Sequence, residues 1–198
     1  MMRKEHKDHI VKSFDQELAH LSELIARMGG LAESQIEQTI QAFSQRDSAL
    51  AQKVVDTDRQ IDELESEIRD FAVSLVALRQ PMASDLRFLV GGIKINSALE
   101  RIGDQAVSIA LRARSLISQP LLKPLIDIPR MTGIVQEMVR YSLDAFVRQD
   151  PDLARNVIDR DDDVDNLRDQ IFRELLTYMM GDPSTIPRAL DLILVSRN

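Results

Sequence analysis

The chain has 198 residues, of which 44% are hydrophobic and 29% are charged, a balance typical of a folded domain. It carries 25 Lys and Arg against 32 Asp and Glu, so the formal net charge is −7, which argues against a nucleic-acid-binding protein. The absence of cysteine excludes disulfide frameworks, zinc fingers and thiol nucleophiles. No apolar run approaches the ~18 residues of a membrane span, and no signal-type stretch follows the charged start, so we expect a soluble, cytoplasmic protein.

The spacing of apolar residues predicts helices from one end of the chain to the other. Between residues 18 and 78 apolar side chains recur mostly at steps of three, four or seven, which is the period of one helix face. A first helix contains residues 18–43, a second begins at the capping residue Asp47, and a third covers about 85–118. The second ends at Gln80, because a residue before proline avoids helical geometry.

A proline-rich linker, with prolines at 120, 124 and 129, separates these helices from a second copy of the same pattern. Residues 42–68 align with 145–171 at a constant shift of 103, and 11 of the 27 pairs are identical where chance gives about two. A fourth helix is predicted over about 122–149, a fifth over about 151–180, and a sixth begins after Pro187.

We therefore predict an all-α protein of two tandem three-helix bundles related by internal duplication. The first bundle takes residues 1–119 and the second takes 120–198. The second is expected to be incomplete, since the sixth helix is only about a third built at Asn198 and its apolar residues would need a continuation.

Three pairs of carboxylates lie four residues apart, which places each pair on one helix face with Cβ atoms ~5–6 Å apart. The pairs are Asp58/Asp62, Glu100/Asp104 and Asp161/Asp165. Oxygen ligands at this spacing suit hard cations, iron or manganese, although a single such pair is more often a solvated surface. The first pair recurs as the third in the duplication while neighbouring polar residues differ. This favours a surface metal site between helices and disfavours a buried catalytic centre.

Other motifs carry less chemistry. Glu17 and His20 have the Glu-x-x-His form of di-iron proteins, but the motif occurs once and the remaining histidines are His6 and His9. Arg87, Lys94 and Arg101 form a basic stripe at heptad spacing, either a solvated face or a contact for an anion or acidic partner. The chain has neither a Gly-x-Gly-x-x-Gly nor a Walker sequence, so no nucleotide site is expected.

The run RQPMASDLRFLVGGIKINSALERIGDQAVSIA at residues 79–110 resembles the signature of the PhoU family, accessory and regulatory proteins of the phosphate-specific transport system. The Met28-Gly29-Gly30 turn region and the Gln149-Asp150 break fit the same resemblance. It implies two tandem three-helix bundles and a non-enzymatic negative regulator of the phosphate-starvation response and of phosphate uptake. The implied role is that of an adaptor between the transporter ATPase PstB and the sensor histidine kinase PhoR. A homodimer that reaches the membrane only through its partners is also implied.

The resemblance further implies metal binding through an (E/D)xxxD motif in each bundle. Its ligands would be Asp58, Asp62, Glu100, Asp104, Asp161 and Asp165. The metal would be magnesium, manganese, iron or zinc, and Gln105 stands where many members have histidine. Two alternatives stay open: an iron or manganese bundle with a storage or enzymatic role, and a purely structural scaffold.

Overall fold

The structure is a computed structural model that describes residues 12–198, and this part of the chain forms helices and no strand. The all-α prediction is therefore confirmed. The first unit contains α1 (Lys12–Gln45), α2 (Ser48–Thr57), α3 (Arg59–Arg79) and α4 (Ser84–Ile117). The second contains α5 (Asp127–Arg148), α6 (Pro151–Asp159), α7 (Asp161–Gly181), the 3-10 helix η1 (Pro183–Thr185) and α8 (Ile186–Arg197).

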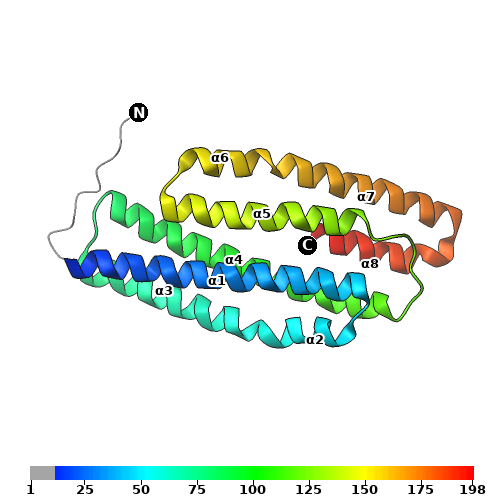
Figure 1. Ribbon diagram of the computed structural model, residues 1–198, viewed down its shortest axis with the longest axis horizontal. Coiled ribbons are helices and arrows are strands. Elements are labelled where there is room, and N and C mark those ends of the chain that lie inside the picture. The colour runs from blue at the N-terminus through cyan, green and yellow to red at the C-terminus, as the bar shows by residue number, and fades with distance from the viewer. Residues whose placement is uncertain (1–11) are drawn as a thin grey trace.

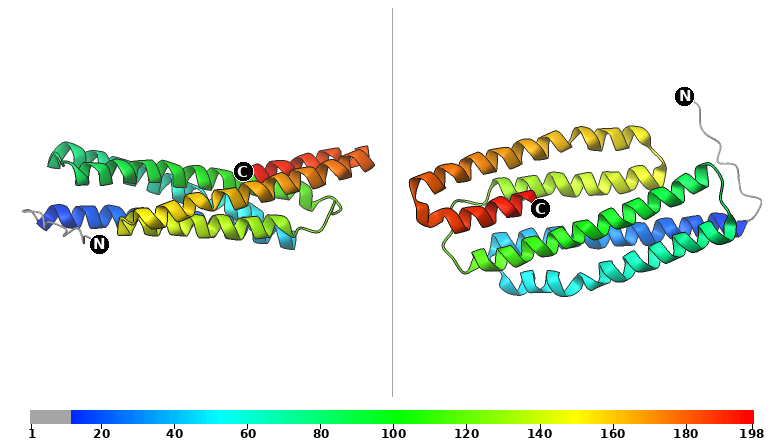
Figure 2. Two further views of the ribbon diagram at one scale, coloured as in Figure 1. Left: turned by 90° about the horizontal axis from the view of Figure 1, so that it is seen from above. Right: turned by 180° about the vertical axis from the view of Figure 1, so that it is seen from behind.

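The helices run roughly along the long axis of the molecule (Figure 1). Helices α1 and α5 lie side by side, α4 and α8 lie together on the opposite side, and each α2–α3 or α6–α7 pair forms an outer edge (Figure 2). The two units thus meet through the contacts α1–α5 and α4–α8. None of the described helices combines the length and apolar character that a bilayer span needs.

The duplicated sequence adopts duplicated geometry at the start of α2 and α6. Arg46 and Gln149 have φ values of 57° and 52°, in the left-handed region, and end the preceding helices. Asp47 and Asp150 then cap α2 and α6, each accepting bonds from the backbone N–H groups two and three residues on. This is the break predicted from the sequence at both positions.

Each helix expected after these caps is interrupted once. The predicted helix from Asp47 to Gln80 is divided at Asp58, and its counterpart at Arg160. Asp58 keeps helical angles (φ −58°, ψ −38°), but the N–H of Ile61 bonds to the Asp58 carbonyl at 2.7 Å, an i→i+3 bond that tightens the turn. The interruption therefore divides the predicted helix at Asp58 into α2 and α3.

Two further expectations are wrong in detail. Residues 28–30 form no turn, because α1 runs through both glycines. The fourth helix begins at Asp127 and not near 122, because the proline-containing linker extends to Ile126, and Pro129 is accommodated in the first turn of α5. Glycine at 29 has a packing role: a Cβ there would lie 2.2 Å from Leu143 Cδ1 of α5.

The duplicated residues Phe43 and Phe146 join the two units by exchanging places. Phe146 of α5 packs on the core of the first unit and stacks on Phe88 of α4, with ring centroids 4.7 Å apart. Phe43 of α1 is buried in the core of the second unit. A Cβ at Gly91 or Gly92 would lie at an ordinary contact distance of 3.4–3.6 Å from the Phe146 ring, whereas at Gly92 it would lie only 3.1 Å from Ile25 Cδ1 of α1. The two units therefore share their cores.

Candidate functional site

The break between α2 and α3 brings Asp58 beneath α4. Gly103 of α4 permits this approach, because a Cβ there would lie 3.2 Å from Asp58 Oδ1, 3.2 Å from Gln35 Oε1 and 3.1 Å from Ile61 Cδ1. Asp62 follows one turn later on α3, and Glu100 and Asp104 flank Gly103 on α4. A small residue at 103 thus sets the closeness of the two carboxylate-bearing helices.

We call the four residues Asp58, Asp62, Glu100 and Asp104 the carboxylate cluster. Burial raises the pKa of Asp58, a hydrogen bond from Gln35 opposes this, and the charges of Asp62 and Asp104 raise the pKa further. Burial also raises the pKa of Glu100, together with the charges of Asp104, Asp62 and Glu65. These effects act across the α3–α4 contact, so the two sequence-predicted pairs form one negatively charged region. Within residues 12–198 no Lys or Arg pairs with any of the four.

Gln35 adds an amide oxygen to this region. Its side chain is only 4% exposed, and its Nε2 donates to Asp58 Oδ1 at 3.2 Å. Its Oε1 has no hydrogen-bond partner, a condition that costs free energy for a buried acceptor. Carboxylate and amide oxygens are the donors preferred by hard divalent cations.

The donor types therefore fit a metal ion, although the side chains form no closed shell. In the described part of the chain, no three Asp, Glu or His side chains converge tightly enough to hold an ion. The metal site remains a prediction. Carboxylate oxygens from both sides of the α3–α4 contact form a negatively charged group, and the amide oxygen of Gln35, which has no hydrogen-bond partner, lies beside them.

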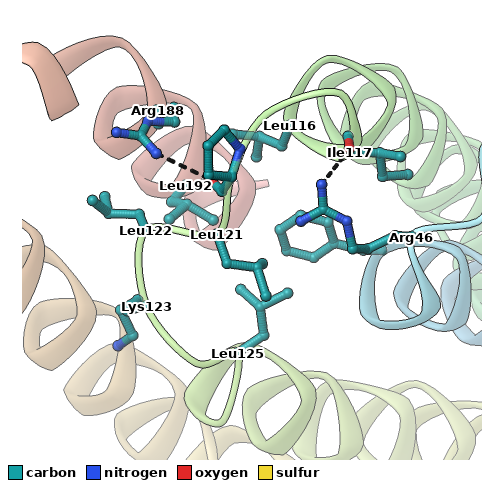
Figure 3. A pocket seen from close by; sticks show the side chains of 11 residues that line it. Arg46, Leu116, Ile117, Leu121, Leu122, Lys123, Leu125, Arg188 and Leu192 are labelled. Carbon is teal, nitrogen blue, oxygen red and sulfur yellow. Dashed lines mark hydrogen bonds between the residues drawn. The ribbon is translucent and has the colours of Figure 1, made fainter.

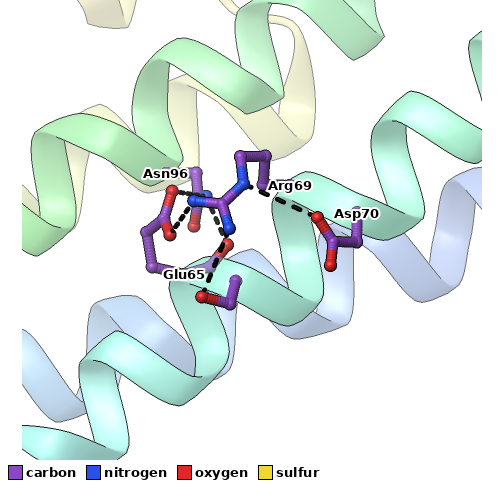
Figure 4. A network of polar contacts seen from close by, with 5 residues as sticks. Glu65, Arg69, Asp70 and Asn96 are labelled. Atoms are coloured by element: carbon purple, nitrogen blue, oxygen red, sulfur yellow. Dashed lines mark hydrogen bonds and ion pairs between the residues drawn. The ribbon is translucent and has the colours of Figure 1, made fainter.

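A polar network adjoins the cluster further along α3 and α4 (Figure 4). The fully buried Asn96 donates from Nδ2 to the backbone oxygen of Glu65 at 2.9 Å and to its Oε1 at 3.3 Å. Arg69 donates to the other carboxylate oxygen of Glu65 at 2.6 Å and lies 3.6 Å from Asp70. The network fixes the register of α3 on α4 and gives Glu65 a cation, which the carboxylate cluster lacks.

The second unit does not reproduce the cluster. Asp161 is exposed, and the half-buried Asp165 accepts a 2.6 Å bond from Arg168. Arg168 occupies the position that corresponds to Glu65 at the shift of 103. A cation thus stands in the second unit where the first has an acid. The recurring pair is partly neutralised there, and the two units are not equivalent.

The Glu-x-x-His motif has a structural role. Arg79 donates to both carboxylate oxygens of Glu17, at 2.8 and 2.6 Å, and the hydrogen bonding lowers the pKa of Glu17. His20 packs edge-on against Phe71, with ring centroids 5.3 Å apart. The motif therefore ties α1 to α3, while the other two histidines lie outside the described residues.

A shallow apolar recess lies under the linker, between the two units (Figure 3). Three cations border it, but each is already occupied by the protein. Arg46 donates to the backbone oxygens of Ile117 and Gln119, and Arg188 donates to that of Pro120. Lys123 pairs with Asp127 and Glu174. The recess therefore offers no free charge to an anion.

Gln35, Glu65 and Asn96 were not predicted from the sequence as part of the site. A signal was present for two of them. Gln35 falls on the apolar face of α1 that includes Met28 and Ala32, and Asn96 falls between Leu89 and Leu99 on the buried face of α4. A polar residue at a core position of a helix needs a specific partner.

Comparison with known proteins gives consistent matches along nearly the whole chain. The PhoU domain matches twice, at residues 25–113 and 128–198. A phosphate-specific transport system accessory protein PhoU homolog of Caulobacter vibrioides is 47% identical over 192 residues, 96% of this chain and 84% of that protein. The homolog of Aquifex aeolicus is 42% identical over 183 residues, 92% of this chain and 83% of that protein.

Solved structures show the same fold. The crystal structure of PhoU from Pseudomonas aeruginosa matches with a TM-score of 0.89 and 40% identity, covering 93% of this chain and 88% of that one. The phosphate transport system regulatory protein PhoU from Streptococcus pneumoniae matches with a TM-score of 0.85 and 25% identity, covering 92% and 86%. With both repeats matched and these identities, the chain belongs to the PhoU family of phosphate-specific transport system accessory proteins.

Proposed function

We propose that this protein is a negative regulator of phosphate uptake and of the phosphate-starvation response. It acts as an adaptor between the ATPase PstB of the phosphate ABC transporter and the sensor kinase PhoR, and it reaches the membrane through these partners. The observation that carries the proposal is membership of the PhoU family over both units. The interlocked units, joined by Phe43 and Phe146, support a role in which a rigid helical surface binds partners.

The proposed mechanism needs no bond-making step by this chain. The adaptor would transmit the availability of phosphate from the transporter to the kinase by binding to them. This role requires a fixed shape and a charged surface that the partners can recognise. Each of the cations around the linker recess bonds to a backbone oxygen or a carboxylate of this same chain. These bonds keep the linker between the units in one conformation. Two such protomers would form the proposed homodimer.

We further propose that the carboxylate cluster binds a divalent cation, magnesium or manganese in the first instance. Asp58, Asp62, Glu100 and Asp104 would supply carboxylate oxygens, and Gln35 would supply its orphaned amide oxygen. A bound cation would neutralise the repulsion across the α3–α4 contact. Asp161 and Asp165 would bind the cation more weakly than the carboxylate cluster does, because Arg168 already pairs with Asp165.

Calorimetric titration of the metal-stripped protein with Mn²⁺ tests the site. We expect binding that is lost when Asp58 and Asp104 are both replaced by Asn, with unchanged helicity. The matched control replaces Asp161 and Asp165 by Asn and should retain most of the heat. Equal loss in both variants, or collapse of helicity in the first alone, contradicts the proposed site.

The regulatory role is tested in cells that lack the chain and carry a phosphate-starvation reporter. We expect the reporter to be active in abundant phosphate and to be silenced when the wild-type chain is restored. Silencing that is independent of the chain contradicts the adaptor role. Purified protein with stoichiometric, tightly held iron and no influence on the reporter would instead favour the metal-storage alternative.

A further inference from the structure

The outer face of the α3–α4 hairpin exposes apolar side chains at its connecting end. Leu86 and Val90 are four residues apart on α4 and are 39% and 43% exposed, and Met82 in the connection is 79% exposed. Val73 on α3 is 55% exposed. The antiparallel register set by the Asn96–Glu65 bond puts Val73 level with residue 88, between Leu86 and Val90. We call these four residues the hairpin face.

A row of basic residues borders this face. Arg87, Lys94 and Arg101 recur every seven residues on α4, so they are spaced ~10.5 Å apart along one edge. All three are exposed, and none forms an ion pair within residues 12–198. The residues that precede them form the heptad row Leu86, Ile93 and Glu100, in which Ile93 packs on the core of the first unit and Glu100 belongs to the carboxylate cluster. In paired helices such flanking positions contact charged residues of the partner helix.

We propose that the hairpin face binds an acidic amphipathic helix of a partner protein, which lies along α4 from Leu86 to Arg101. Its apolar residues would cover Val73, Leu86 and Val90, and its acidic residues would pair with the basic row. This distance of 15 residues spans ~22 Å, or about four helical turns, which is enough for two heptads of contact. Interface cores are apolar with charged rims, as here.

A helix fits these charges better than a flat anionic surface does. Asp70 on α3, with its side chain 79% exposed, lies on the far side of the hairpin face, and the carboxylate cluster continues the same outer side of α4. A plane of negative lipid headgroups would meet these acids together with the basic row. A single helix, ~10 Å wide, contacts the row and avoids Asp62 and Asp70 on α3, and it reaches the carboxylate cluster only at its Arg101 end, beside Glu100.

The inference goes beyond the proposed function, because it names a surface and the chemistry of what binds there and requires no metal. The probes are two synthetic four-heptad helices with Leu at the seam, one with Glu and one with Lys at all flanking positions. Their affinities for the whole chain are measured by fluorescence anisotropy in a buffer with chelator. Failure of the metal site therefore leaves this test unaffected.

The test variant is Arg87→Glu, Lys94→Glu and Arg101→Glu in one chain. The matched control is Arg148→Glu, Arg155→Glu and Arg173→Glu, which changes the net charge equally on exposed positions of the second unit. A further variant, Leu86→Ser with Val90→Ser, removes apolar contact without a change of charge. Circular dichroism tests whether all three remain helical, as we expect for exposed positions.

The wild-type chain should bind the Glu helix more tightly than the Lys helix. The α4 variant should weaken the Glu helix by about tenfold or more and prefer the Lys helix, while the control stays within about threefold of wild type. The serine variant should also bind more weakly. Equal loss in the α4 variant and the control, no preference between the helices, or no binding to wild type would overturn the proposal. So would phosphatidylglycerol vesicles that sediment with the wild type and not with the α4 variant while neither helix binds.

Discussion

The close contact between α1 and α5 requires a residue without a side chain at position 29. The neighbouring Gly30 provides a control with which the cost of an added Cβ at position 29 can be measured. Gly29 is buried and faces Leu143, whereas Gly30 is exposed and has no atom within 4 Å of an added Cβ. Both lie inside α1, where alanine is favoured over glycine by about 0.5–1 kcal/mol. The replacement Gly30→Ala should therefore raise the free energy of unfolding by about that amount.

Gly29→Ala gains the same helix propensity but meets Leu143. The new Cβ would lie 2.2 Å from Cδ1, 3.3 Å from Cγ and 3.4 Å from Cδ2, where ordinary carbon contacts are ~3.5–4.0 Å. Because Cδ1 overlaps the new Cβ and Cγ is closer than a normal contact, the Leu143 side chain must move, at the ~1–3 kcal/mol typical of overpacking. We expect Gly29→Ala to be less stable than Gly30→Ala by about 1–3 kcal/mol, or about 2–12 °C in melting temperature for a chain of this size.

Urea titration of the two variants measures this difference. The control is the same Gly29→Ala replacement made in the Leu143→Ala variant. There it should destabilise less than it does in the wild type, because the clash with the leucine side chain is removed. Equal stabilisation by the two glycine replacements would refute the close α1–α5 packing described above.

Three other changes test separate parts of the structure by thermal or chemical unfolding in chelator. Amide replacement of all four members of the carboxylate cluster should stabilise the chain by roughly 1 kcal/mol at pH 7, a screened value for a surface group. The pKa values of Asp58 and Glu100 are raised in the folded state, so the stability of the wild type relative to this variant is greatest below the ordinary pKa values of these groups and declines as the pH rises through the raised ones. An excess stability of the variant that shrinks with rising pH contradicts the assignment. Ala83 has φ 49° and ψ −104°, so Ala83→Gly should stabilise by about 1 kcal/mol, and destabilisation would show that the residue is unstrained. Phe146→Ala should cost about 2–3 kcal/mol, below the value for a fully buried ring, and an effect under about 1 kcal/mol would contradict the exchange of aromatic residues between the units.

Local features of the fold were predictable from the sequence because their causes are local. The caps at Asp47 and Asp150, the end of α3 before Pro81 and the start of α4 each depend on a few neighbouring residues. The interruption at Asp58 was not predicted, since a single i→i+3 bond leaves no mark on apolar periodicity.

Features that join distant segments could not be predicted in the same way. The approach of Gly29 to Leu143 and the stacking of Phe146 on Phe88 depend on how the two units pack, and helical periodicity shows only which side of each helix is buried. The spacing of the carboxylates predicted that the two members of each pair lie on one helix face. It did not predict that the two pairs of the first unit lie beside each other. That arrangement comes from the α3–α4 contact at Gly103 and from Gln35, a residue in α1.

The proposed function requires that this chain binds the transporter and the kinase. The most direct test measures its affinity, by biolayer interferometry, for purified PstB and for the cytoplasmic part of PhoR, with the chain metal-stripped and again with saturating Mn²⁺. We predict binding to at least one of the two, strengthened by Mn²⁺ in the wild type and not in the variant with Asn at Asp58 and Asp104. Absence of binding to both partners with and without the metal would contradict the account.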